Sequence, residues 1–186
     1  MGAVNTVMDA LIAIWGLENV LDWCKTKHIM RRGYQGGTFD GNNSKRILEY
    51  TDDLFNAVPV NCRPLVELLQ VFEPIVSGTF GHNLDPDFEM LIKDYVNKFL
   101  EVQRYCQSME PPVKLNITWK VHVIAIHLPQ FLHKSGVGMA RYSEQTAESV
   151  HHRMKASFER FCVGEGHPKH AEKLMRAMIE FSSQRI

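Results

Sequence analysis

The sequence is poor in several features that define large classes of proteins, and each shortage excludes one of these classes. Only four cysteines occur among 186 residues, with no CxxC pair, so no disulfide framework is indicated. No apolar run reaches the roughly 18 residues that a membrane span needs. The apolar N-terminus also lacks the basic segment that precedes a signal peptide. We therefore expect reduced thiols, no membrane partner, and a nuclear or cytoplasmic location.

Net charge is also lacking, but the zero is an average over two unlike parts. Residues 1–111 carry 10 Lys and Arg against 15 Asp and Glu, whereas residues 112–186 carry 11 against 6. The first part therefore has a charge of −5 and the second +5, and the second holds seven of the nine histidines. We expect an acidic helical part and a basic, His-rich helical part that meet at Pro111-Pro112 and form one compact unit.

Apolar residues recur at helical spacing along nearly the whole chain, which predicts a mainly α fold of about six or seven helices. The segments expected to be helical are 4–23 with a break at Gly16, 44–58, 65–76, 85–102, 118–131, 143–162 and 171–181. Four glycines and two asparagines exclude a regular element over 31–43. The strongest pattern, over 85–102, predicts a helix that packs its apolar side into a core.

Capping residues predict where some helices begin. Asn43 or Ser44 is expected to cap the second helix, and Asp85 followed by Pro86 the fourth. The stretch KLNITWKVHVIAIHL (114–128) is ambiguous, because its alternation favours a strand and its apolar spacing favours a helix. We expect a helix from about Thr118, with at most a short strand near 114–120.

A polar ridge on the helix expected after Ser143 carries the first candidates for chemistry. Glu144, Glu148, His151 and Lys155 step by four, three and four residues, so they lie on one helix face. A carboxylate beside imidazoles can serve a metal site or act as a general base. The same spacing is typical of a solvent-facing row of i,i+4 pairs. Spacing alone leaves both interpretations open.

The histidines form a second candidate group. His122 and His127 are five residues apart, a poor spacing for two metal ligands on one α-helix. No compact signature joins them to Cys162, His167 or His170. Surface histidines and a zinc site thus remain alternative interpretations.

Basic side chains of the second part form the third group, because they can contact the phosphate backbone of DNA. They are Lys120, Arg141, Arg153, Lys155 and Arg160. A charge of +5 over residues 112–186 is modest, and ordinary solubility explains it about as well. We expect any DNA binding to be weak, independent of sequence, and confined to residues 112–186.

Three blocks of the sequence carry a resemblance to a known family. They are YQGGTFDGNNSKRIL (34–48), WKVHVIAIHLPQFLHKSGVGMARYSEQTAESVHHRMK (119–155) and HPKHAEKLMRAMIEFSSQRI (167–186). In this order they resemble the C-terminal part of large transposase-like proteins encoded by animal DNA transposons. The layout is similar to that of CACTA-type and Kyakuja-Dileera-Zisupton-type transposases, and the central block is the most distinctive.

The resemblance implies a parent protein with a ribonuclease-H-like core, in which two aspartates and a glutamate hold two Mg²⁺ or Mn²⁺ ions. Such ions support cleavage and strand transfer at DNA phosphodiesters. It identifies Glu148 as the catalytic glutamate and metal ligand, on a late helix after a helical insertion, with Glu144 as the alternative. Both aspartates are expected upstream of Met1, and Asp40 stands where the family pattern has Glu.

One carboxylate cannot hold two hard cations, which need several oxygen ligands. The resemblance therefore implies a transposase-derived fragment that is inactive alone and holds no cofactor, with weak affinity for DNA. The alternative is a non-enzymatic helical interaction module that binds a protein partner, or a second copy of itself, through exposed apolar surface.

Overall fold

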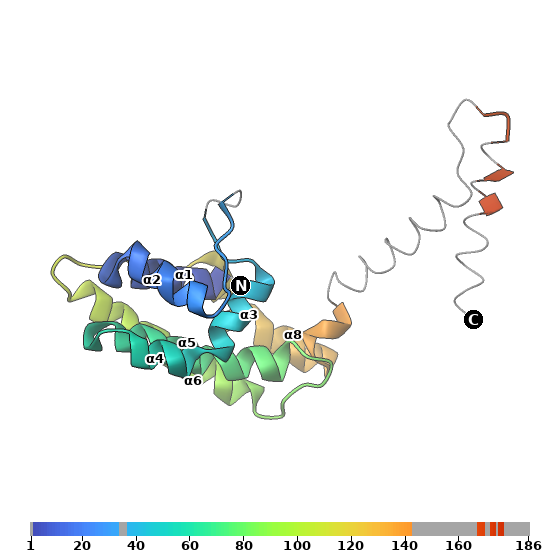
Figure 1. The fold of residues 1–186 in the computed structure, drawn as a ribbon. Helices are drawn as coiled ribbons and strands as arrows, with labels where there is room; N and C mark the ends of the chain where they lie inside the picture. Colours follow the sequence, from blue (N-terminus) through green and yellow to red (C-terminus); the bar gives the residue numbers. More distant parts are fainter. Residues whose placement is uncertain (1, 34–36, 143–166, 170–171, 174, 177–186) are drawn as a thin grey trace. The chain divides into compact units, whose positions relative to one another are not determined.

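The computed structural model describes residues 2–33, 37–142, 167–169, 172–173 and 175–176. They belong to two compact units, residues 1–139 and 140–186. In the described residues the secondary structure is helical, apart from an isolated antiparallel bridge between Arg32 and Thr38 (Figure 1). The mainly α fold predicted from the apolar periodicity is confirmed. None of the helices in these residues is both long enough and apolar enough to cross a membrane.

The first unit is built from α-helices, with longer connecting segments over 27–40 and 108–118. They are α1 (Gly2–Trp15), α2 (Leu17–Thr26), α3 (Gly41–Glu49), α4 (Thr51–Ala57), α5 (Arg63–Thr79) and α6 (Phe88–Gln107). A final helix consists of α7 (Trp119–His122), the π-helical segment η3 (Val123–His127) and α8 (Leu128–Ser135). The 3-10 turns η2 (Val60–Cys62) and η4 (Met139–Tyr142) complete the described elements.

Helix α5 lies at the centre of the first unit, where it packs against α1, α3, α4 and α6 (Figure 1). Its apolar stripe is fully buried: Leu65, Leu68, Leu69, Phe72 and Ile75. Helix α6 buries the matching stripe of Phe88, Ile92, Tyr95, Phe99 and Val102. These stripes form the middle of the core, as the three-and-four spacing predicts, except that the predicted members Val76 and Leu91 are only partly buried.

Two breaks divide the N-terminal helices. Gly16 separates α1 from α2 as predicted, and its φ of +92° is a conformation that glycine adopts without strain. The single helix predicted over 44–58 is wrong, because Tyr50 leaves helical geometry between α3 and α4. The Thr51 hydroxyl donates to the Leu48 carbonyl at 3.2 Å, so a side chain takes one of the acceptors at the end of α3.

The capping residues differ from those predicted. Helix α3 begins at Gly41, and Asp40 is its N-cap, accepting a hydrogen bond from the Asn43 amide at 2.9 Å. Arg32 Nε also donates to the Asp40 carboxylate at 2.9 Å, and these bonds hold the pKa of Asp40 below its usual value, the Asn43 amide contributing most. Asp40 thus has an evident structural role, while Asn43 and Ser44 lie buried inside the helix.

The start of α6 shifts in the same way. The helix begins at Phe88 after the N-cap position Asp87, not at Asp85 and Pro86. The Asp85 carboxylate instead accepts from the Asp87 amide at 2.8 Å, which forms a turn just before the helix.

The ambiguous stretch after Pro112 is resolved in favour of the helix. The helix starts at Trp119, close to the predicted Thr118, which caps it by accepting from the Val121 amide, and the described residues 114–118 form no strand. Leu115 is buried, and its carbonyl accepts from Gln103 Nε2 at 2.7 Å. Residues 112–139 belong to the same compact unit as residues 1–111.

The second unit is described at few positions. The Lys173 amide donates to the Lys169 carbonyl at 3.0 Å, as in a helical turn, and Arg176 pairs with Glu172 at 3.1 Å. The helices predicted over 143–162 and over most of 171–181 lie outside the described residues.

Candidate functional site

The helix formed by α7, η3 and α8 has one buried side and one exposed side. Val121, Ile124, Leu128 and Leu132 enter the core. The helix starts at the Thr118 cap and ends at Gly136, whose φ of +64° gives the left-handed cap that glycine favours. The remaining residues of this helix are exposed or half-buried.

The π-helical segment changes which residues share a face. Hydrogen bonds from residue i to i+5 place residues five apart above one another. The rings of His122 and His127 accordingly meet edge-on, with centroids 5.2 Å apart and planes at 72°. The expectation that this spacing suits two ligands poorly applies to a regular α-helix, whereas the segment here is π-helical. The pair offers two of the four ligands of a tetrahedral zinc ion, and among the described residues no third His, Cys, Asp or Glu joins them.

The exposed side at the start of this helix combines apolar and basic groups. Trp119 is 72% exposed, Ile117 55% and Ile126 48%. Lys120 and His122 are exposed between them. No Asp or Glu occurs from residue 111 to residue 143, so the segment contributes only neutral and basic side chains. We call the surface formed by Ile117, Trp119, Lys120, His122 and Ile126 the Trp119 face.

Lys120 lies against the first turn of α1. A Cβ atom on Gly2 would collide with the Lys120 methylene groups, so only a glycine leaves this space for the lysine stem. Helix α7 therefore packs against α1 partly through a charged side chain, whose alkyl stem is covered while the residue as a whole stays exposed.

The C-terminal end of the helix contacts the start of α6 and the turn between α5 and α6. His133 pairs with Glu89 of α6 through Nε2, and its ring stacks edge-on against Phe88. The Gly138 amide donates to the His82 carbonyl at 3.3 Å. A Cβ on Gly138 would collide with the carbonyl oxygen of Gly81, so the close backbone approach requires glycine. The Trp119 face thus belongs to a helix anchored at both ends.

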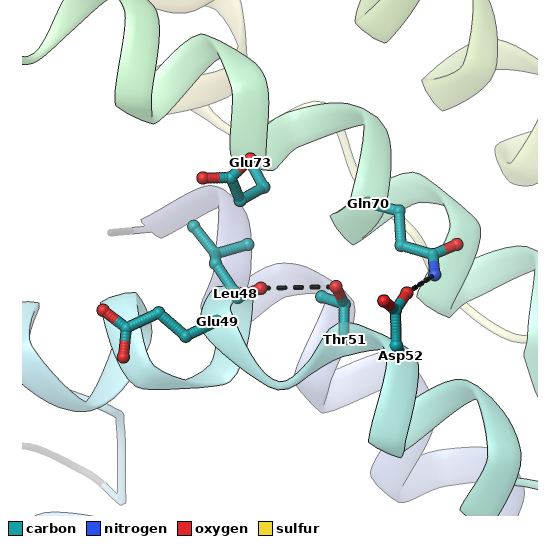
Figure 2. A pocket seen from close by; sticks show the side chains of 6 residues that line it. All are labelled: Leu48, Glu49, Thr51, Asp52, Gln70 and Glu73. Atoms are coloured by element: carbon teal, nitrogen blue, oxygen red, sulfur yellow. Dashed lines mark hydrogen bonds between the residues drawn. The ribbon is translucent and has the colours of Figure 1, made fainter.

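A separate acidic cleft lies between the α3–α4 junction and α5 (Figure 2). It is lined by Leu48, Glu49, Thr51, Asp52, Gln70 and Glu73. Gln70 Nε2 donates to Asp52 Oδ1 at 2.8 Å, so part of its polar lining is already paired. Sequence reasoning missed this cluster, because its acids come from different helices that only tertiary packing brings together.

The described cysteines are poor candidates for nucleophiles. Cys24, Cys62 and Cys106 are free and buried. Burial raises the pKa of the Cys24 and Cys62 thiols to about 11 and also raises that of Cys106. They stay protonated at neutral pH, which fits the reduced thiols expected from the sequence.

The sequence-predicted site residues divide into two groups. Glu144, Glu148, Arg153, Lys155 and Arg160 lie outside the described residues. Lys120 and Arg141 are described, and both are exposed. Lys120 belongs to the first compact unit and Arg141 to the second. Of the predicted site residues, Lys120 is the one described in the first unit, where Ile117, Trp119 and His122 near it in the sequence are also exposed.

Comparison with protein-family models, with curated proteins and with solved structures finds no match to this chain.

Proposed function

We propose that this chain is a transposase-derived helical module that contacts the phosphate backbone of DNA and has no catalytic activity alone. The observation that carries the proposal is the Trp119 face, where Lys120 and His122 lie exposed in a segment without carboxylates. The resemblance of the three sequence blocks to animal transposases supports the origin of the module.

The contact is electrostatic and weak. A lysine at a phosphate releases condensed counterions, so affinity falls as salt rises. Few cations are available: residues 111–143 hold only Lys114, Lys120, Lys134 and Arg141. Arg153, Lys155 and Arg160 add to them in our proposal. A small number of phosphate contacts gives modest, sequence-independent affinity.

Catalysis belongs to the parent protein in this proposal. Glu148 contributes one carboxylate to the metal-binding set there, with Glu144 as the alternative, and the two aspartates are other residues of that parent protein. Mg²⁺ or Mn²⁺ then supports attack on the phosphodiester. This chain alone is expected to show no Mg²⁺-dependent cleavage of a DNA duplex. Cleavage that disappears in Glu148→Gln would overturn that part of the proposal.

DNA binding is tested by fluorescence anisotropy with a labelled duplex over a range of salt concentrations. Lys120→Gln is expected to lower affinity at low salt and to reduce the slope of log K against log salt by about 1. Lys25→Gln is the matched control, because Lys25 is an exposed lysine of the acidic part that pairs with Asp22. Binding that survives high salt, or that responds equally to both variants, contradicts the proposal.

A protein-interaction module is the second candidate, favoured by the exposed apolar groups Ile117, Trp119 and Ile126. This function includes self-association. Sedimentation equilibrium then shows a mass that rises with protein concentration and returns to that of the monomer in Ile126→Ser. A monomeric wild-type chain would exclude the homo-oligomer.

A further inference from the structure

Trp119 is unusual among the tryptophans of this chain. Trp23 is 7% exposed and Trp15 packs against the core, whereas Trp119 is 72% exposed. It stands in the first turn of α7, two residues before the buried Val121, and therefore on the opposite side of the helix from the core. Within the described residues none of the ring or cation contacts involves Trp119. Its indole faces are available for a planar ligand.

The surroundings of Trp119 select the charge of that ligand. Lys120 is the next residue, and its stem is held beside Gly2 at the start of α1. Lys114 and His122 are exposed on either side in the sequence. Because no carboxylate occurs from residue 111 to residue 143, this segment favours an anionic occupant.

We propose that Trp119 is a stacking platform for an unpaired base, so that the Trp119 face binds single-stranded nucleic acid in preference to duplex. This inference rests on the proposed backbone-binding function and adds the class of nucleic acid. Phosphate contacts alone do not produce the preference, since a duplex carries the higher charge density. In a duplex, however, the base faces are covered by their neighbours, and an exposed indole can stack only on a base that is unpaired.

The chemistry of the face divides the binding into two parts. Lys120 holds the phosphate backbone and loses affinity as salt rises, whereas stacking on Trp119 responds little to salt. Stacking on any base also explains why no sequence preference is expected, because every base has a π face. The preference for single strands should therefore persist when salt weakens total binding.

The experiment compares a labelled twelve-nucleotide dT strand with a labelled twelve-base-pair duplex by fluorescence anisotropy. The wild-type chain is expected to bind the single strand more tightly. Trp119→Ala should weaken single-strand binding by about 5- to 150-fold and leave duplex binding nearly unchanged. Trp119→Phe keeps an aromatic face and should restore most of the affinity. Val60→Ala is the matched control, because Val60 is an apolar side chain as exposed as Trp119, at 72%, and lies outside the Trp119 face.

Fluorescence of the indole gives a second readout. Since Trp119 is the most exposed of the three tryptophans, the dT strand should quench part of the emission in wild type and not in Trp119→Phe. Circular dichroism melts verify that each variant is folded; an exposed side chain is expected to affect them little.

The outcomes separate this inference from the proposed function. Equal or tighter duplex binding that Trp119→Ala does not change overturns the stacking role and leaves backbone binding intact. An equal loss in Val60→Ala also overturns it, because the loss would then not depend on the Trp119 indole. No binding to either nucleic acid at low salt refutes the proposed function itself.

Discussion

Replacing Tyr95 by Phe is expected to stabilise the first unit. Tyr95 is 1% exposed, and its hydroxyl has no hydrogen-bond partner among the described residues, although the group is fully enclosed. An unsatisfied buried polar group costs about 1–3 kcal/mol. The ring itself packs well, with centroids 5.0 Å from Phe72 and 6.1 Å from Phe99. Phe keeps these contacts and removes only the unpaired oxygen.

The magnitude follows from two opposing effects. Removing the hydroxyl recovers its desolvation cost, while the small void of roughly 10 Å³ costs about 0.2 kcal/mol. The net gain is about 1–3 kcal/mol in the free energy of unfolding. Each kcal/mol raises Tm by about 2–4 °C in a chain of this size. Urea and thermal unfolding followed by circular dichroism measure both quantities.

The matched control is Tyr105→Phe on the same helix. The Tyr105 hydroxyl donates to the Asn61 carbonyl at 3.0 Å, so its removal is expected to cost about 0.5–1.5 kcal/mol. The two Tyr-to-Phe changes should therefore have opposite signs. A loss of stability beyond about 1 kcal/mol in Tyr95→Phe would refute the reasoning, because the hydroxyl would then be hydrogen-bonded in the folded protein.

The same residue predicts a dependence on pH. Burial raises the pKa of Tyr95 above its usual value of 10.0. The folded protein keeps this proton at pH values where the unfolded chain releases it, so stability falls as pH rises above the usual value. Tyr95→Phe should remove this contribution, and the difference between variant and wild type should grow above about pH 10.

Three further predictions concern other parts of the chain. Gly138→Ala should destabilise the fold by more than about 1 kcal/mol in urea titrations, because its Cβ meets backbone oxygen, whereas Gly33→Ala, which enters open space, should change little. Asp40→Asn should lower Tm at pH 7, because the pKa of Asp40 lies below its usual value of 3.8 and its carboxylate therefore stabilises the fold above that pH. The Tm values of wild type and variant should converge as pH falls below 3.8. A difference in Tm that stays constant with pH would contradict this. Glu148→Gln should leave the free energy of unfolding nearly unchanged if Glu148 is a metal ligand of the parent protein. A thermal melt that shows a loss of stability beyond about 1 kcal/mol would transfer that role to Glu144.

The fold could be predicted from periodicity wherever one helix face is apolar throughout. The stripes of α5 and α6 and the break at Gly16 follow from local spacing and from glycine itself. Helix starts were harder to predict, because several acceptors compete within a few residues. Asp40 becomes the α3 cap since its backbone is extended and Arg32 holds its carboxylate, and Arg32 is eight residues away. Such a contact is not visible in a capping pattern.

The candidate site could be predicted only in part. Exposed lysines follow from composition, and Lys120 was among them. The edge-on contact between the rings of His122 and His127 lies at a π-helical segment, which no spacing rule for α-helices anticipates. Trp119 was visible as an aromatic residue near basic ones, but its exposure depends on which side of the helix enters the core. That side is set by tertiary packing against α1 and α6.

The π-helical segment also accommodates one extra residue in the final helix. A π turn holds one more residue than an α-helical turn, so the α-helical residues on either side of it can keep their facing. Deleting Ala125 should therefore allow regular α geometry and leave Val121, Leu128 and Leu132 in the core. The same helix would keep Trp119 on the outside at one end and the Glu89 contact at the other. A single-residue deletion, which usually turns one part of a helix against the other, should thus be tolerated at this segment.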